Sequence, residues 1–180
     1  MALTVEDGTV VAGADSYISL ANAKTYHTAH DDPTDWTSAS DAEKCDGKME
    51  CRRCEKESAL KYGAATLDGA FDWDGQITSA TQVLAWPRAD CSDREGRTPA
   101  DNVIPQQVKD AQCELAVVHL GTVLTSTYDR DGMVASEQAG PVKIEYQDGA
   151  PGEATWPYIL RLLNGLALRR SSVAIDIERA

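Results

Sequence analysis

The clearest pattern in the chain is a helical repeat of apolar residues after Ile104-Pro105. Spacings of three and four residues place one apolar face along the stretch that ends at Leu120: Val108, Ala111, Leu115 and Val118. Pro105 suits the first turn of a helix, because an amide hydrogen there has no partner within the helix. We therefore predict a central helix that begins at Pro105.

The segment before this helix predicts an extended anchor. Trp86 precedes Pro87, and a proline ring removes a backbone donor and favours extended geometry in the preceding residue. The run Gln82–Arg88 is therefore not expected to be helical, and residues 89–103 after it are rich in turn formers. Further upstream, acidic residues and glycine alternate with Phe71, Trp73 and Ile77. This pattern predicts a short irregular segment whose aromatic residues lie on the core.

Three further helices are predicted from caps and apolar spacing. The first covers residues 17–30 and takes its cap from Asp15 or Ser16. The second starts at the capping box Ser40-Asp41-Ala42-Glu43 and closes at Asp68-Gly69. The third follows Trp156-Pro157, where a proline again suits a helix start.

Two runs after the central helix have the composition of strands. Val134–Glu137 and Val142–Tyr146 are rich in β-branched and aromatic residues, and they predict a β-hairpin over residues 133–147. Lys143 and Glu145 alternate there with apolar residues, so they are expected on the polar face. The tail alternates in the same way, and such a run favours pairing with a sheet edge of its own chain or of a partner: Val173, Ile175 and Ile177.

A chain of 180 residues is long enough to bury one continuous core. We expect one domain over residues 1–170 and an extended tail over 171–180. No apolar run approaches the roughly 20 residues that span a bilayer. The first residues lack a basic region followed by an apolar run, so neither export nor membrane attachment is expected.

Charge narrows the function classes. The chain has 17 Lys and Arg against 29 Asp and Glu, a formal net charge of -12. Tight binding to nucleic acid of any sequence depends on cations that neutralise phosphates, so this balance argues against it. The densest basic pairs, Arg52-Arg53 and Arg169-Arg170, are not interleaved with the aromatic residues that single-strand binders use for stacking.

The five cysteines and the histidines give no strong metal or catalytic signal. An odd cysteine count without an export signal indicates reduced thiols. Cys51 and Cys54 form a C-x2-C pair near Cys45, but no second ligand pair follows at zinc-site spacing. His27 and His30 are expected to end a helix. The common nucleophile, phosphate-loop and zinc-protease motifs do not occur, so no catalytic residue, metal or cofactor is expected.

Short motifs nevertheless follow one another in a specific order: Asp15-Ser16-Tyr17, Ser40-Asp41-Ala42-Glu43, Gln82–Arg88, Ile104-Pro105 with Val108-Lys109, and the hairpin up to Tyr146. Together they resemble the head-tail connector (adaptor) proteins of long-tailed bacteriophages. Proteins of this kind are often labelled as similar to the single-stranded DNA-binding primosomal protein DnaT. Residues 45–55 depart from the likeness and look like an insertion into the second helix.

The resemblance implies a mainly α fold, a small bundle of about four helices with a β-hairpin and extended terminal arms. It also implies a structural protein of the virion neck, present in the host cytoplasm during assembly, rather than an enzyme. About twelve copies would form a ring under the portal protein and join neck or tail-terminator proteins. Genomic DNA would pass through the channel without specific binding. Contacts are expected at Arg88, Lys143, Glu145, Val173, Ile175 and Ile177.

Two other functions stay open. A DnaT-like single-stranded DNA-binding replication protein predicts strong, salt-dependent DNA binding. A small thiol or zinc enzyme that uses Cys45, Cys51 and Cys54 predicts bound metal.

Overall fold

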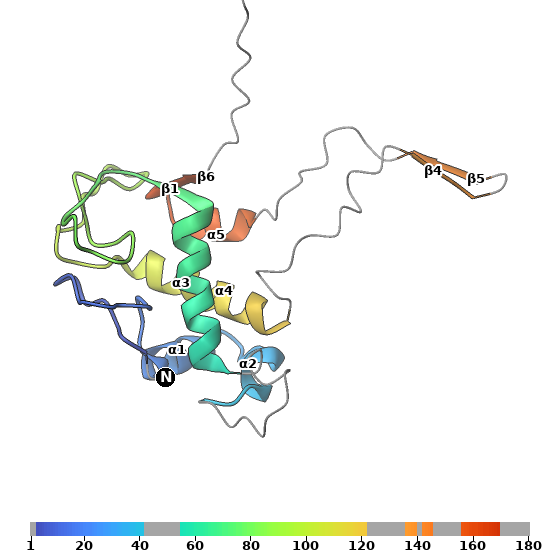
Figure 1. The fold of residues 1–180 in the computed structure, drawn as a ribbon, viewed down its shortest axis with the longest axis horizontal. Helices are drawn as coiled ribbons and strands as arrows, with labels where there is room; N and C mark the ends of the chain where they lie inside the picture. Colours follow the sequence, from blue (N-terminus) through green and yellow to red (C-terminus); the bar gives the residue numbers. More distant parts are fainter. Residues whose placement is uncertain (1–2, 42–54, 122–135, 140–141, 146–155, 170–180) are drawn as a thin grey trace, which may run out of the picture. The chain divides into compact units, whose positions relative to one another are not determined.

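The computed structural model describes residues 3–41, 55–121, 136–139, 142–145 and 156–169 (Figure 1). The chain divides into two compact units: residues 1–124 with 158–180, and residues 125–157. Within the described residues the secondary structure is mainly α, with short antiparallel pairs of strands. The first unit carries every helix described below except the first residue of the last one.

Two long helices, α3 (Lys56–Ala70) and α4 (Gln106–Gly121), form the centre of the first unit. Figure 1 shows α4 crossing α3 at a steep angle. The crossing is close because Gly63 of α3 has no side chain. A Cβ atom at Gly63 would lie 2.9 Å from the main-chain oxygen of Gln112 in α4. The contact therefore depends on glycine at this position.

Two shorter helices cover one end of this pair. α1 (Leu20–Ala29) contacts α3 and α4, and α2 (Thr34–Ser38) contacts α4. Their buried residues join Ile18 and buried residues of the long helices in one apolar cluster: Ile18, Ala23, Trp36, Ala59, Leu60, Cys113 and Ala116. Burial of this cluster fixes α1 and α2 against α3 and α4.

Short strands connect the other end of α3 to the C-terminal part of the chain. β1 (Phe71–Trp73) pairs antiparallel with β6 (Ala167–Arg169), which follows α5 (Pro157–Leu162). β2 (Gln76–Ile77) pairs antiparallel with β3 (Arg88–Ala89). Segments from residue 71 to 89 are thereby tied both to each other and to the C-terminal element.

The second unit contains the predicted β-hairpin. β4 (Ser136–Ala139) and β5 (Val142–Glu145) are antiparallel, with Gln138 opposite Lys143 and Ser136 opposite Glu145. The hairpin predicted over residues 133–147 is confirmed for these two strands.

The central helix is confirmed, but its buried face is rotated from the predicted one. α4 follows Pro105 directly and buries Val108, Ala111 and Leu115 as expected. Val118 is 37% exposed instead of buried. The helix buries Gln112 and His119 because the side chains that meet α3 and the N-terminal segment are partly polar.

Several helix boundaries differ from the prediction. α1 takes its cap from Ser19, not from residues 15–16. α3 begins at Lys56 rather than at the capping box. Ser40 forms an isolated parallel β-bridge with Glu55. Residues 42–54 lie outside the described residues. Gly69 does not end α3, which continues to Ala70, and α2 occupies part of the loop expected over 31–37.

The expected bundle of four similar helices is only partly confirmed. The fold is mainly α with a hairpin, but only α3 and α4 are long, with 15 and 16 residues, while α2 and α5 have 5 and 6. Helices this short cannot pack along the whole length of α3 or α4, because each turn advances only about 5.4 Å.

Two glycines of α3 give a matched test of the helix crossing. Gly63→Ala is expected to lower the free energy of unfolding by about 1–3 kcal/mol, because the added methyl group meets the α4 backbone. Gly69→Ala has open space around it, so it is expected to be neutral or stabilising by up to about 1 kcal/mol through helix propensity. Chemical denaturation measures both variants. Equal effects at the two positions would contradict the close crossing.

Candidate interaction surface

A buried polar network attaches the predicted anchor to the helices. The Tyr17 hydroxyl donates to Asp68 Oδ1 at 2.6 Å, and the Ala85 amide donates to Asp68 Oδ2 at 2.9 Å. The Trp86 amide donates to the Tyr17 oxygen at 3.3 Å. Trp86 itself is fully buried, and its ring meets the edge of Trp73 with the centroids 5.8 Å apart. The anchor is therefore held by both packing and hydrogen bonds.

Burial changes the proton affinities of this network. It raises the pKa of the Asp68 carboxyl to about 6, although the hydrogen bonds from Tyr17 and the Ala85 amide oppose the rise. Burial, with the neighbouring Asp68 carboxylate, also raises the pKa of Tyr17 well above its ordinary value. The Tyr17 hydroxyl thus remains protonated near neutral pH and keeps donating to Asp68.

Arg88 points inward and binds main-chain oxygens. Its guanidinium donates to the oxygens of Asp74 and Gly75, each at 2.7 Å, and to that of Ala85 at 3.2 Å. Within the chain, Arg88 holds the turn between β1 and β2 against the anchor, because several carbonyl groups of that turn converge on it. The contact role predicted for Arg88 stays a prediction.

The anchor and its turns leave apolar side chains on the outside. Ile77 is 52% exposed, Val83 is 60% exposed and Val103 is 47% exposed. Of the aromatic residues predicted to lie on the core, Phe71 is buried and Trp73 is partly buried. Ile77 points outward because β2 pairs with β3 at the surface of the loops rather than against a helix. These three residues lie in turn-rich segments, where no periodic pattern marks them.

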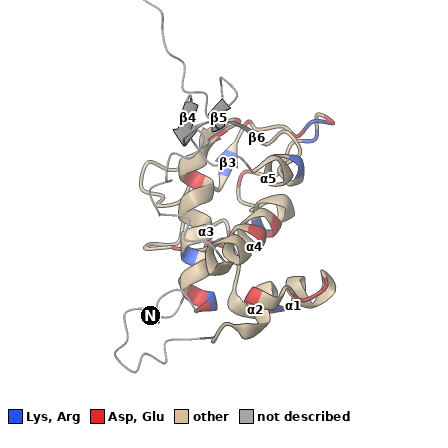
Figure 2. Cartoon of the chain, turned by 90° about the vertical axis from the view of Figure 1, so that its right-hand side faces the viewer, with Lys and Arg blue, Asp and Glu red and all other residues tan. Residues whose placement is uncertain are grey.

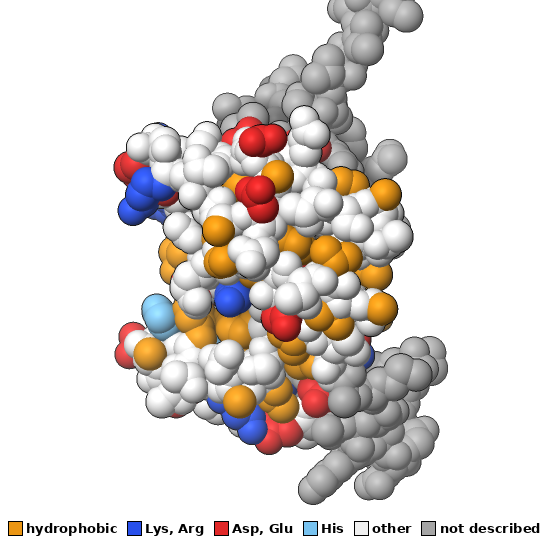
Figure 3. Space-filling view, turned by 90° about the vertical axis from the view of Figure 1, so that its left-hand side faces the viewer, with side chains coloured by type: hydrophobic (Ala, Val, Ile, Leu, Met, Phe, Trp, Pro, Cys, Tyr) orange, Lys and Arg blue, Asp and Glu red, His pale blue; other side chains and the backbone are white. Residues whose placement is uncertain are grey.

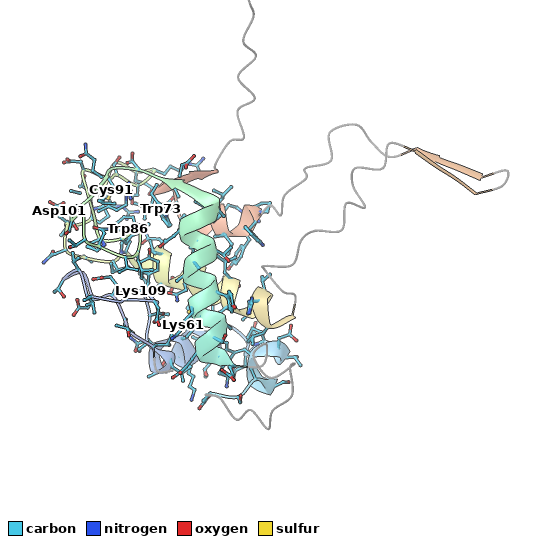
Figure 4. All side chains as sticks on the ribbon, viewed as in Figure 1. Lys61, Trp73, Trp86, Cys91, Asp101 and Lys109 are labelled. Atoms are coloured by element: carbon cyan, nitrogen blue, oxygen red, sulfur yellow. The ribbon has the colours of Figure 1, made fainter. Side chains whose placement is uncertain are left out.

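Figure 4 shows where this loop region stands relative to α3. Trp73, Trp86 and Cys91 lie together beside the helix, and Asp101 lies at the outer edge of the loops. The inner residues are the packed ones, since Trp86 and Cys91 are buried. The outer edge is therefore the part of the loops available to a partner.

The other predicted contact residues belong to other parts of the chain. Lys143 and Glu145 belong to β5, in the second unit. Val173, Ile175 and Ile177 lie outside the described residues. The contact roles predicted for these five residues stay predictions.

The basic side chains do not form a basic face. Figure 2 shows Lys and Arg positions interspersed with Asp and Glu. Four of the described basic side chains form ion pairs: Lys24 and Lys56 with Asp41, Lys61 with Asp15, and Arg97 with Asp93 and Glu95. These cations already have carboxylate neighbours, which lowers the positive potential that they offer to a phosphate backbone.

The described residues hold no group of His, Cys, Asp or Glu that would bind a metal ion. Cys91 and Cys113 are buried free thiols, and Cys45, Cys51 and Cys54 lie outside the described residues. His27 is buried against the Trp36 ring, and burial lowers its pKa to about 4. Within the described ranges, no helix is long and apolar enough to cross a membrane.

A family model described as "Putative DnaT-like ssDNA binding protein" matches residues 1–180. Because this match covers the whole chain, the chain belongs to that family. A search of curated proteins and a search of solved structures gave no match.

Substitutions of Arg88 test its structural role. Arg88→Ala is expected to lower the free energy of unfolding by about 1–3 kcal/mol, because several main-chain carbonyl groups lose a charged donor. Arg88→Lys is expected to restore only part of this, since an ammonium group does not reproduce the planar fork of donors. Arg161→Ala, at an exposed position of α5, serves as the control and is expected to change stability by no more than about 0.5 kcal/mol. An Arg88→Ala variant of unchanged stability and weakened self-association would instead support a contact between subunits.

The raised pKa of Asp68 predicts a pH-dependent stability. The folded-state pKa of Asp68, about 6, exceeds the ordinary 3.8. Asp68 therefore adds to the free energy of unfolding below pH 4, and this contribution is lost as the pH rises through 6. At about 1.4 kcal/mol per pKa unit, the loss is at most about 3 kcal/mol. Chemical denaturation of wild type and Asp68→Asn between pH 4 and 7 gives the free energy of unfolding of each protein as a function of pH. The difference between these two pH profiles measures the loss.

The difference isolates Asp68 from other titrating groups. His27 acts in the opposite direction, because stability is lost as the pH falls through 6.5 toward 4. Both proteins contain His27, so this effect cancels. The exposed Asp31→Asn substitution is the matched control. Parallel profiles of wild type and Asp68→Asn would contradict the prediction.

Proposed function

We propose that this member of the DnaT-like family is a structural subunit, a head-tail adaptor that forms a ring under a portal protein and joins it to neck or tail-terminator proteins. The proposal places it in the virion neck, after assembly in the host cytoplasm, and gives it no catalytic role. Its support is the ordered resemblance described above together with the distribution of charge on the described residues.

The observation that carries the proposal is the pairing of the basic side chains. Lys24, Lys56, Lys61 and Arg97 lie against carboxylates in a chain of net charge -12. An acidic wall repels the phosphates of DNA and lets it slide without sticking. This property suits a subunit that surrounds passing DNA better than one that must hold a single strand.

The proposed contacts come from different parts of the chain. The hairpin, with Lys143 and Glu145 on β5, would contact a neighbouring protein, and the tail with Val173, Ile175 and Ile177 would pair with another copy. Arg88 has a supporting role, because it holds the loops that display Ile77 and Val83.

The second candidate is a single-stranded DNA-binding protein, which the description of the family favours. Such proteins combine a positive groove with exposed aromatic platforms. Two exposed tyrosines are present among the described residues, Tyr62 and Tyr158, at 38% and 48% exposure. Tyr62 already stacks on His119, with ring centroids 4.4 Å apart, so one of its faces is covered. The structural subunit is the candidate that we favour.

One pair of measurements separates the two functions. Electron microscopy of the purified protein mixed with its portal protein is expected to show added ring density on the portal. Fluorescence anisotropy with a labelled oligothymidylate at low salt is expected to show no binding. A protein that stays monomeric, never joins the portal and binds the oligonucleotide with a steep salt dependence would establish the DNA-binding function instead.

A further inference from the structure

The outer edge of the loops contains a groove that none of the predicted contacts uses. It has a volume of about 410 Å³ and lies between the N-terminal loop, the β2–β3 pair and the loop before α4. We call it the loop-face groove. Its lining includes Gly8, Val10, Ile77, Ala89, Asp90 and Asp101. Figure 3 shows the side of the molecule that carries these loops, where hydrophobic side chains gather between scattered charges.

One wall of the groove is held in place by a buried carboxylate. Glu6 is 1% exposed, and its side chain accepts hydrogen bonds from the amides of Gly8, Val10 and Val11 at 2.9, 3.0 and 2.8 Å. These bonds fix the left-handed turn in which Val10 has φ 62°. The N-terminal loop is therefore a preformed wall.

The wall is also locked onto the loop before α4. A Cβ atom at Gly8 would lie 1.9 Å from the main-chain oxygen of Asn102, so these two segments touch through their backbones. On the opposite side, Arg88 holds the turn that leads into β2. A groove with walls fixed in this way loses little conformational freedom when a ligand binds.

The chemistry of the groove selects its occupant. Ile77 supplies an apolar surface that is 52% exposed. Asp90 and Asp101 are the charged side chains among the lining residues, and no Lys or Arg lines the groove. The groove therefore fits an extended segment that presents apolar side chains on one face and carries cations at its ends.

The C-terminal segment of this same chain has that composition. Val173, Ile175 and Ile177 lie on one face when the segment is extended, and Ala174, Asp176 and Glu178 lie on the other. Arginines flank this run on both sides, at positions 170 and 179. We propose that residues 170–180 of a second copy of the chain dock in the loop-face groove, an inference that rests on the proposed assembly of this protein into rings.

The direction of β6 favours a second copy over the same chain. β6 is antiparallel to β1, with Ala167 opposite Trp73 and Arg169 opposite Phe71. The last residue of β6 therefore lies beside the first residue of β1. The end of β1 that leads to β2 and the groove lies at the opposite end of this strand pair. The eleven residues 170–180 span at most about 40 Å when extended.

One groove and one tail per chain make a head-to-tail contact. Such a heterologous contact generates a closed ring when the rotation between subunits fits, and a filament when it does not. This is the type of contact that the proposed ring needs.

Complementary full-length variants test the contact in solution. Ile77→Lys removes the apolar surface of the groove, and Val173→Asp with Ile175→Asp removes that of the tail. Sedimentation velocity is expected to show oligomers for wild type, monomers for each variant alone and heterodimers for their equimolar mixture. The mixture forms dimers because it retains one intact groove for each intact tail. A mixture that stays monomeric while wild type forms oligomers would overturn the proposal.

If wild type is monomeric at accessible concentrations, a peptide-binding measurement tests the contact instead. A labelled peptide of residues 169–180 is expected to bind the full-length tail variant, and an added Ile77→Lys substitution is expected to weaken binding at least tenfold. Val83→Lys is the matched control, because Val83 is 60% exposed but does not line the groove. Absent binding, or equal weakening by both substitutions, would overturn the proposal. If the tail variant binds the peptide but a monomeric wild type does not, the tail docks in the groove of its own chain. This outcome also overturns the proposal.

The portal experiment separates this inference from the function on which it rests. If the peptide does not bind but rings still form on the portal, the groove contact is wrong and the adaptor function stands. If the variants form heterodimers but no ring joins the portal, the contact stands and the adaptor function fails.

Discussion

The fold depends on one buried amide, the side chain of Gln112 at the crossing of α3 and α4. Its nitrogen donates to the Ser16 hydroxyl and to the Leu60 main-chain oxygen, both at 2.8 Å, and its oxygen accepts from the Tyr17 amide at 2.9 Å. The residue is fully buried, so any partner lost would leave a polar group without compensation. Gln112 thus fixes where the N-terminal segment, α3 and α4 meet.

The same region determines where the loops lie. Tyr17, which Gln112 positions through its backbone, bonds Asp68 at the end of α3, and Asp68 bonds the amide before Trp86. Arg88 then ties the anchor to the β1–β2 turn through main-chain oxygens. The Gln112, Tyr17 and Asp68 side chains thus lie in one connected set of hydrogen bonds. The apolar side chains of Ile77 and Val83 are left outside, where a partner is able to bury them.

The charge distribution follows a related division of roles. Carboxylates that face inward have structural tasks: Glu6 holds a loop of backbone amides and Asp68 holds the anchor. Asp41 and Asp15, which are nearer the surface, neutralise lysines, and the exposed Glu95 pairs with Arg97. In the proposed function, the remaining acidic excess keeps phosphate groups at a distance.

Local patterns in the sequence determined the elements that depend on few neighbours. The start of α4 after Pro105, the start of α5 at Pro157 and the strands of the hairpin follow from proline geometry and residue alternation. Prediction failed where the deciding partner lies far along the chain. The burial of Gln112 depends on Ser16 and Leu60, and the inward turn of Arg88 depends on carbonyl groups of the β1–β2 turn.

The candidate surface was the part least visible in the sequence. Ile77 has the same local pattern as the buried Phe71, and only the pairing of β2 with β3 turns it outward. The groove beside it joins three loops from residues 8, 77 and 101, which no local pattern relates. The sequence by itself determined the composition, the charge and the main helices and strands. Only the tertiary structure decided which polar groups are buried and which apolar ones are exposed, because each choice depends on partners brought together by folding.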